Sequence, residues 1–209
     1  MQCNICMNSQ NNEIYYVKER MLNRGDEFKY FYCKKCGTLQ VIDIPKDMEI
    51  YYKNYPVFNK EVNSSNKYLK YILGNISASR MRGLLPRTIR ESINYEGYRC
   101  IAKLNIHKRG RILDVGCGTG EWLDSLHDIG YKNLYGVDKY APRKNNIGGV
   151  RFVQGDVFKI TKSKFDLITL HHSFEHMDNP REVLKHLNIL IKKKGTIVIR
   201  IPVMESEAW

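Results

Sequence analysis

The stretch Ile112-Leu113-Asp114-Val115-Gly116-Cys117-Gly118-Thr119-Gly120 decides the fold. A short apolar strand runs into a turn with glycine at every second position, and a helical pattern follows over residues 121–126. Alternating glycines let the backbone turn sharply at the carboxyl end of a strand, and they let a ligand approach the main chain closely. The N–H groups at the start of the helix can receive an anionic group. The stretch therefore predicts a strand, a ligand-binding turn and a helix.

Further strands follow at the intervals that a doubly wound sheet imposes. They are predicted at residues 133–138, 150–153, 165–170 and 196–201. The helix between the last two is expected to begin at Pro180, with Asn179 as its N-cap. It is expected to end at Gly195, with residues 192–194 in its last turn. This alternation predicts an α/β fold with a Rossmann-like, doubly wound and mostly parallel sheet.

The spacing of the glycines bears on the ligand. Dinucleotide sites favour G-x-G-x-x-G, whereas this turn reads G-x-G-x-G and follows an acidic residue, Asp114. That difference argues against NAD. Asp138 ends the next strand 18 positions after Gly120, close to where such folds place a carboxylate for ribose hydroxyls.

Over about residues 83 to 201 the sequence resembles the class I S-adenosylmethionine-dependent methyltransferases. The resemblance rests on residues 114–120, the strand that ends at Asp138, the segment Gly155-Asp156-Val157 and the segment Phe174-Glu175-His176. These pieces occur in the order that the family shows, which makes the match specific.

The resemblance implies roles for individual residues. The glycines of the turn would lie under the methionine part of S-adenosylmethionine, with Asp114 supporting the turn or meeting the amino group. Asp138 would accept hydrogen bonds from the ribose hydroxyls, and Asp156 would meet the adenine amine beside the Val157 backbone. The expected cofactor-binding set is Asp114, Gly116, Cys117, Gly118, Gly120, Asp138, Lys139, Asp156, Val157 and His171.

Methyl transfer also requires a positioned acceptor and, where the acceptor atom is protonated, a base. Histidine titrates near neutral pH and suits this role. The catalytic candidates beside the expected cofactor are His171, His172, Glu175 and His176, with His172 or His176 as the favoured base. Each of them could instead cap the strand or the following helix.

Two CxxC pairs near the N-terminus form an independent signal. Cys3 and Cys6 make the first pair and Cys33 and Cys36 the second, with 26 residues between Cys6 and Cys33. Four thiolates at this spacing match a tetrahedral structural zinc site with no open position for catalysis. Disulfide pairing is the alternative, but the N-terminus does not resemble a secretory signal. A zinc ribbon in a reducing, cytoplasmic compartment is therefore expected.

The 209 residues suit one full domain and a small metal-stabilised one. Residues 1–60 are expected to form the zinc ribbon and a Tyr-rich segment, 61–110 a basic helical connector, and 111–209 the S-adenosylmethionine-binding domain. No stretch approaches the length and apolarity of a membrane span. Class I methyltransferases normally continue beyond the fifth strand, so this domain is expected to be incomplete at its C-terminal end. An exposed edge there would favour homo-oligomers.

The net charge of +12 is concentrated in the connector, where residues 61–110 hold ten Lys or Arg against three acidic residues. A basic face beside a cofactor cleft favours an anionic acceptor, such as RNA or the diphosphate of an activated sugar. A solvated helix face explains the same charge equally well.

The ribbon ahead of a class I domain, followed by Tyr51, Tyr52 and Tyr55, is similar to bacterial methyltransferases that act on sugars in natural-product or surface-polysaccharide pathways. The leading expectation is therefore a transferase that methylates a small molecule or a sugar, including a nucleotide-linked one. One alternative is an RNA base methyltransferase that holds RNA with the ribbon and the connector. The other is a non-catalytic module that keeps the cofactor pocket.

Overall fold

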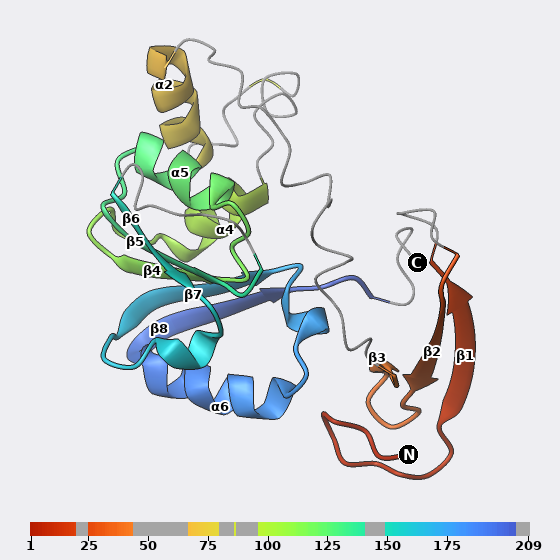
Figure 1. Cartoon of the computed structure of the whole chain (residues 1–209). Coiled ribbons are helices and arrows are strands. Elements are labelled where there is room, and N and C mark those ends of the chain that lie inside the picture. The colour runs from red at the N-terminus through yellow and green to blue at the C-terminus, as the bar shows by residue number, and fades with distance from the viewer. Residues whose placement is uncertain (20–24, 44–66, 80–85, 87–95, 141–148, 204–209) are drawn as a thin grey trace.

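A parallel sheet forms the centre of the structure, a computed structural model that describes residues 1–19, 25–43, 67–79, 86, 96–140 and 149–203 (Figure 1). Its strands are β4 (Arg111–Val115), β5 (Asn133–Asp138), β6 (Val150–Gln154), β7 (Phe165–His171) and β8 (Ile191–Arg200). The order across the sheet is β6-β5-β4-β7-β8, and every neighbouring pair is parallel. The expected Rossmann-like α/β fold is therefore confirmed. The strand order reverses between β4 and β7, which is where such sheets bind ligands.

Helices cover both faces of this sheet because its strands are apolar on both sides. Side chains alternate along β4, so Ile112 enters one core cluster and Leu113 the other. The helices α4 (Glu96–Leu104) and α5 (Glu121–Asp128) supply Ile101, Leu123 and Leu126 to the first cluster. The helix α6 (Pro180–Leu190) packs on the opposite face through Val183, Leu187 and Leu190. Figure 1 shows α4 and α5 on one side of the sheet and α6 on the other.

The boundary between α6 and β8 differs from the prediction. The helix ends at Leu190, and the strand already begins at Ile191, so residues 192–194 are extended. Lys192 reaches Asp166 on β7, and the register between β7 and β8 shifts between Phe165 and Leu167. A Cβ on Gly195 would lie 2.9 Å from the carbonyl oxygen of Phe165. Gly195 is therefore a strand residue that allows close approach to β7, and the prediction that it ends a helix was wrong.

A small antiparallel sheet lies near the N-terminus. It consists of β1 (Glu13–Lys18), β2 (Glu27–Tyr32) and β3 (Leu39–Val41), in that order. Its apolar cluster centres on Cys3, Phe31 and Cys33. One further helix, α2 (Lys67–Ser77), is described in the connector. The arginines at positions 80, 82, 87 and 90, on which the expected basic connector depends, lie outside the described residues, as do Tyr51, Tyr52 and Tyr55. Within the described part, no helix has the length and apolarity needed to cross a membrane.

Candidate functional site

A cavity of about 570 Å³ opens at the carboxyl ends of β4, β5, β6 and β7. Its size lies in the range of small-molecule and cofactor pockets. The predicted site residues that line it are Asp114, Gly116, Cys117, Gly118, Asp138, Lys139, Asp156, Val157, His171, His172 and His176. The remaining two, Gly120 and Glu175, do not line it. The structure thus brings most of the predicted site to one place, from segments that are far apart in the sequence.

The glycine turn after β4 forms one wall of the cavity. Gly116, Gly118 and Gly120 all have positive φ, at 72°, 55° and 85°. The N–H groups of Gly116 and Cys117 both donate to the Val137 carbonyl, over 2.8 and 3.3 Å, which ties the turn to β5. A Cβ on Gly116 would lie 2.3 Å from Cβ of Ser173. The turn therefore needs glycine here both for its conformation and for space.

Asp138 ends β5 and faces the turn. Its Oδ2 accepts a hydrogen bond from the Gly118 N–H over 2.8 Å, and its Oδ1 accepts one from the Tyr140 N–H over 2.8 Å. Asp156 follows β6 and caps a short 3-10 helix, η3 (Val157–Lys159), by accepting from the Phe158 N–H over 3.0 Å. The Asp156 residue is exposed, whereas Val157 beside it is buried. Two carboxylates thus stand at the ends of neighbouring strands, around the rim of one cavity.

Asp114 is buried at the end of β4, with 3% of its surface exposed. Burial raises the pKa of its carboxyl to about 7, and the charge of Asp138 adds to this rise. The Thr169 hydroxyl, which donates to Oδ1 of Asp114 over 2.8 Å, opposes the rise. The Asp114 carboxyl is therefore partly protonated near neutral pH. A bound ammonium group would favour its ionised form.

The segment after β7 forms a second wall of the cavity, next to the glycine turn. The His171 ring meets the Trp122 ring edge to face, with 4.8 Å between centroids. His172 has a positive φ of 51°, uncommon for a residue other than glycine, and its N–H donates to the Arg200 carbonyl over 2.8 Å. Its Nε2 accepts from Nε of Arg200 over 2.9 Å, and its Nδ1 lies 3.8 Å from Oε1 of Glu175. Arg200 therefore holds His172 through both main chain and side chain.

Two titratable groups of this segment are shifted by their surroundings. Desolvation, followed by the neighbouring His172, lowers the pKa of His176, which lies in a short 3-10 helix, η4 (Phe174–His176). Desolvation raises the pKa of the Glu175 carboxyl. His176 lines the cavity and Glu175 lies next to it in the sequence, and perturbed groups at a cavity are typical of functional sites. This shift favours the neutral form of the His176 ring, which can accept a proton.

Comparison with known families shows to which family the chain belongs. The model of a family described as "Methyltransferase domain" matches residues 81–208 of this chain. The chain belongs to this methyltransferase family. The resemblance to class I S-adenosylmethionine-dependent methyltransferases is thereby confirmed.

Relatives of this methyltransferase domain share only part of their length with it. The mitochondrial ubiquinone biosynthesis O-methyltransferase of Saccharomyces cerevisiae is 30% identical over 139 residues, which cover 60% of this chain and 44% of that protein. The demethylmenaquinone methyltransferase of Staphylococcus saprophyticus is 28% identical over 111 residues, which cover 48% of each. The chain spans less than half the length of these curated relatives.

Solved structures of low sequence identity are also similar. The YcgJ protein of Bacillus subtilis matches with a TM-score of 0.44 and 20% identity, over 51% of this chain and 50% of that one. A methyltransferase of Thiobacillus denitrificans in complex with S-adenosylhomocysteine matches with a TM-score of 0.41 and 18% identity, over 80% of this chain and 61% of that one.

Several residues of the methyltransferase site were missed by sequence reasoning. Thr169 binds Asp114, Ser173 donates from Oγ to the Val115 carbonyl over 2.6 Å, and Arg200 holds His172. Trp122 lines the cavity from α5. The signal for Thr169 was available, because it is the one hydroxyl-bearing residue of β7 and has apolar neighbours on both sides. Ser173 and Arg200 carried no such signal.

The four cysteines predicted to bind metal form a separate cluster. Their sulfur atoms all lie within 4.8 Å of one another; the Cys3–Cys36 pair is 3.6 Å apart and the Cys6–Cys33 pair 3.5 Å apart. Ligand sulfurs about 2.3 Å from a tetrahedral zinc ion lie about 3.8 Å from one another, so the spacing fits.

Hydrogen bonds to the Cys3 and Cys33 sulfurs favour the thiolates that zinc requires. Sγ of Cys3 accepts from the N–H groups of Ile5 and Cys6 and from Nε2 of Gln40. Burial acts to raise the pKa of Cys33, but the N–H groups of Cys36 and Lys35 and the neighbouring thiols lower it to about 6. The donor set, its spacing and its hydrogen bonds all fit a zinc ion.

Proposed function

We propose that the cavity binds S-adenosylmethionine and that the chain transfers its methyl group to a small-molecule acceptor. One observation carries the proposal: the glycine turn, Asp138 and Asp156 converge on a single cavity at the carboxyl ends of the strands. The site residues keep the roles that the family resemblance gave them. The glycine turn would lie under the methionine part, Asp138 would bind the ribose hydroxyls, and Asp156 would meet the adenine amine.

S-adenosylmethionine supplies an electrophilic methyl carbon on a sulfonium. In the transfer, an acceptor oxygen, nitrogen or carbon forms a bond to that carbon as the carbon–sulfur bond breaks, and the acceptor proton passes to a base. We assign this base to His176, because its lowered pKa keeps it neutral and it lines the cavity. His172 is the less favoured candidate, since its Nε2 already accepts a hydrogen bond from Arg200.

The acceptor that we propose is a small molecule. Within that class we propose a sugar or a nucleotide-linked sugar. The names of the relatives support the wider class, since they denote methyltransferases of ubiquinone and menaquinone biosynthesis. The sugar assignment rests on the likeness of a cysteine ribbon before a class I domain to sugar methyltransferases. Incubation with labelled S-adenosylmethionine and parallel panels of sugar nucleotides and demethylated quinones would separate the two.

Calorimetric titration with S-adenosylmethionine and S-adenosylhomocysteine tests the cofactor site. Asp138→Asn keeps the shape of the side chain but removes the charge that would bind the ribose hydroxyls. We expect it to weaken binding at least about tenfold, the cost of losing charged hydrogen bonds. Asp128→Asn, at the exposed end of α5, is the matched control and should bind like the wild type. Equal affinities for both variants would remove Asp138 from its role and weaken the proposal as a whole.

We further propose that the four N-terminal cysteines bind a structural zinc ion. Metal analysis should give about one zinc per chain, and Cys33→Ser should abolish it. Cys100→Ser, outside the cluster, should keep the metal. We also propose a reducing, cytoplasmic location, because four zinc-binding cysteines must stay reduced. A full zinc complement in Cys33→Ser would rule the site out.

A further inference from the structure

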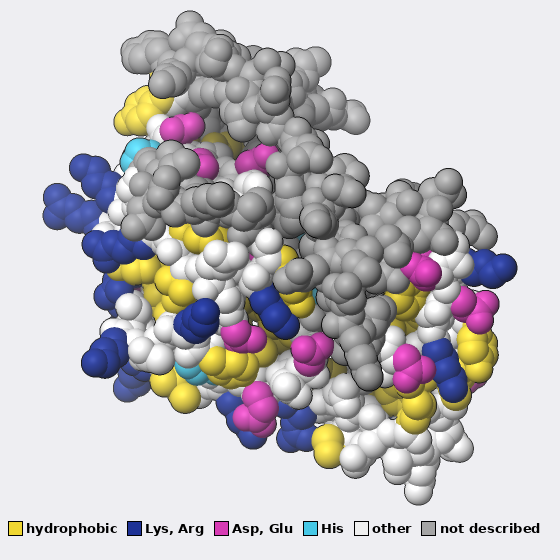
Figure 2. All heavy atoms as spheres, viewed as in Figure 1, with side chains coloured by type: hydrophobic (Ala, Val, Ile, Leu, Met, Phe, Trp, Pro, Cys, Tyr) yellow, Lys and Arg dark blue, Asp and Glu magenta, His cyan; other side chains and the backbone are white. Residues whose placement is uncertain are grey.

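The sheet has a second edge, opposite the cavity, and basic residues accumulate there. We define the amino-edge surface as the basic residues at or next to the starts of the five strands. They are Lys108, Arg109, Arg111, Lys132, Arg151, Lys162, Lys164, Lys192, Lys193 and Lys194. All five strands are parallel, so these residues share one edge, and Figure 2 shows Lys and Arg side chains crowded along the left side of the molecule.

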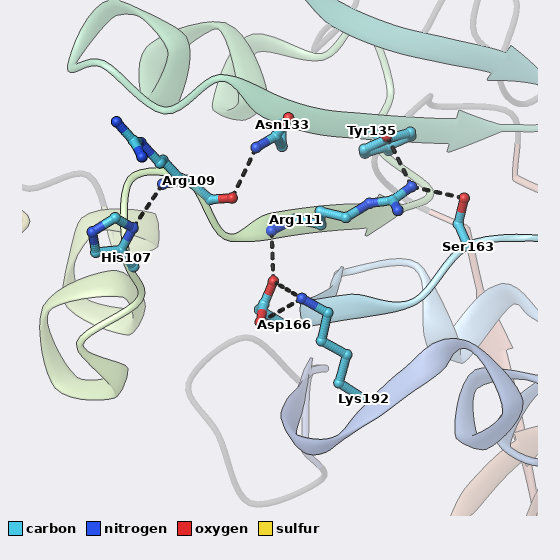
Figure 3. A network of polar contacts seen from close by, with 8 residues as sticks. All are labelled: His107, Arg109, Arg111, Asn133, Tyr135, Ser163, Asp166 and Lys192. Atoms are coloured by element: carbon cyan, nitrogen blue, oxygen red, sulfur yellow. Dashed lines mark hydrogen bonds and ion pairs between the residues drawn. The ribbon is translucent and has the colours of Figure 1, made fainter.

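Few acidic side chains offset this charge. The strand starts and the segments leading into them contain Asp166 and Asp128 as their described acidic residues. Asp166 is already paired with residues of this surface (Figure 3). Its Oδ1 and Oδ2 accept from Nζ of Lys192 over 3.0 and 2.8 Å, and Oδ2 also accepts from the Arg111 N–H over 2.8 Å. Lys132, Lys162, Lys193 and Lys194 are exposed, and within the described chain they form no salt bridge. The positive charge of this surface is therefore largely uncompensated.

Part of the surface is also held in a fixed geometry. The Arg111 guanidinium lies over the rings of Tyr135 and Phe165, 5.0 and 5.5 Å from their centroids. It donates to the Tyr135 hydroxyl and to Oγ of Ser163, each over 2.9 Å (Figure 3). Arg151 donates to the same Tyr135 hydroxyl from the neighbouring strand. Cations fixed on a rigid sheet lose little conformational entropy on binding an anion.

We propose that the amino-edge surface binds single-stranded RNA through its phosphates. Neighbouring strands lie about 4.8 Å apart, so five strands present cations along about 19 Å. A flexible single strand, with a phosphate at every nucleotide, can follow such a row. The inference goes beyond methyl transfer, because the surface lies at the edge of the sheet opposite the cavity.

An anionic membrane is the competing partner, and two observations disfavour it. Among the exposed large apolar side chains of the described chain, only Ile189 lies beside a start of these five strands, so the surface offers a single anchor for the acyl region. A membrane at this edge would also leave the cavity facing away from the lipid. RNA bound there leaves the cavity open to small substrates from solution.

The test is titration of the full chain against a labelled single-stranded RNA at several salt concentrations, followed by fluorescence anisotropy. The edge variant combines Lys132→Gln, Lys162→Gln and Lys193→Gln. The control variant removes the same charge at exposed positions elsewhere, with Lys18→Gln, Arg181→Gln and Lys185→Gln. We expect the edge variant to lose at least about tenfold in affinity and about two units of salt slope, at about 0.7 per phosphate contact. The control should stay close to wild type.

Three results would overturn the proposal. The first is that the wild type does not bind RNA, and the second is that both variants lose RNA affinity equally. The third is that the wild type binds phosphatidylserine vesicles more tightly than RNA and that the edge variant weakens vesicle binding to the same extent. Equal losses would mean that net charge alone drives binding. S-adenosylmethionine affinity, measured for both variants, should match that of the wild type. A failure of the RNA-binding proposal can therefore be distinguished from a failure of the proposed cofactor site.

Discussion

At the scale of single residues, Asp114 makes stability depend on pH. Its carboxyl is buried beside Thr169, and its pKa in the folded chain is about 7, against an ordinary value of 3.8. The folded chain therefore retains a proton that the unfolded chain has already released, and stability falls as pH rises through this window. The loss is on the order of 4 kcal/mol across the window, at about 1.4 kcal/mol per pH unit. Asp114→Asn should remove it, as measured by urea unfolding at several pH values.

Asn at position 114 keeps the acceptor that the Thr169 hydroxyl uses, so the comparison isolates the charge. Asp128→Asn, at an exposed position, should leave the pH dependence as it is in the wild type. If Asp114→Asn still loses stability between pH 3.8 and pH 7, the buried carboxyl is not the cause.

The same residue shows what the sequence could and could not reveal at this scale. Asp114 and Asp138 were predictable because each lies at or next to the end of a mainly apolar strand, and strand ends of a parallel sheet meet at one edge. The contacts that set their chemistry were not predictable. Thr169 reaches Asp114 from β7, and Arg200 reaches His172 from β8. Both contacts depend on strand neighbours that only the folded sheet defines.

At the scale of elements, the glycine turn shows why a local pattern predicted this part of the fold so well. The pattern that predicts the strand, the turn and α5 lies wholly within residues 111–128. The prediction for the start of β8 was wrong for the opposite reason. Residues 192–194 suit the last turn of a helix, but Lys192 pairs with Asp166, and Gly195 packs against β7. Tertiary pairing overrode the local preference.

The turn also supplies a prediction with an internal control. Gly116→Ala would place a Cβ 2.3 Å from Cβ of Ser173, in a backbone conformation with φ of 72°. We expect it to lower the free energy of unfolding by about 2 kcal/mol or more and to weaken S-adenosylmethionine binding. Gly130 also has a positive φ, of 97°, but the Cβ that Gly130→Ala adds would have no atom within 4 Å. It should cost only the backbone strain of about 1 kcal/mol. Equal losses in urea unfolding would show that the contact with Ser173 does not matter.

At the scale of the whole molecule, the apolar residues fall into separate clusters. Two clusters cover the two faces of the parallel sheet, and a third surrounds Cys3 and Cys33. The cavity is lined by residues 114–183 alone among the described residues, so the cysteine cluster contributes no wall to it. The zinc site and the cofactor site should therefore be thermodynamically separable.

Removal of the metal tests this separation. A chelator, or Cys33→Ser, should unfold β1–β3, since this small sheet has little apolar core of its own. S-adenosylmethionine affinity should stay within about twofold of the untreated chain, because the strands that carry the cavity keep both of their cores. Hydrogen exchange would follow both parts together: amides of β1 and β2 should lose protection while those of β4 and β7 keep it. Loss of cofactor binding along with the zinc would mean that the N-terminal sheet supports the cavity, and the two sites would then have to be treated as one folding unit.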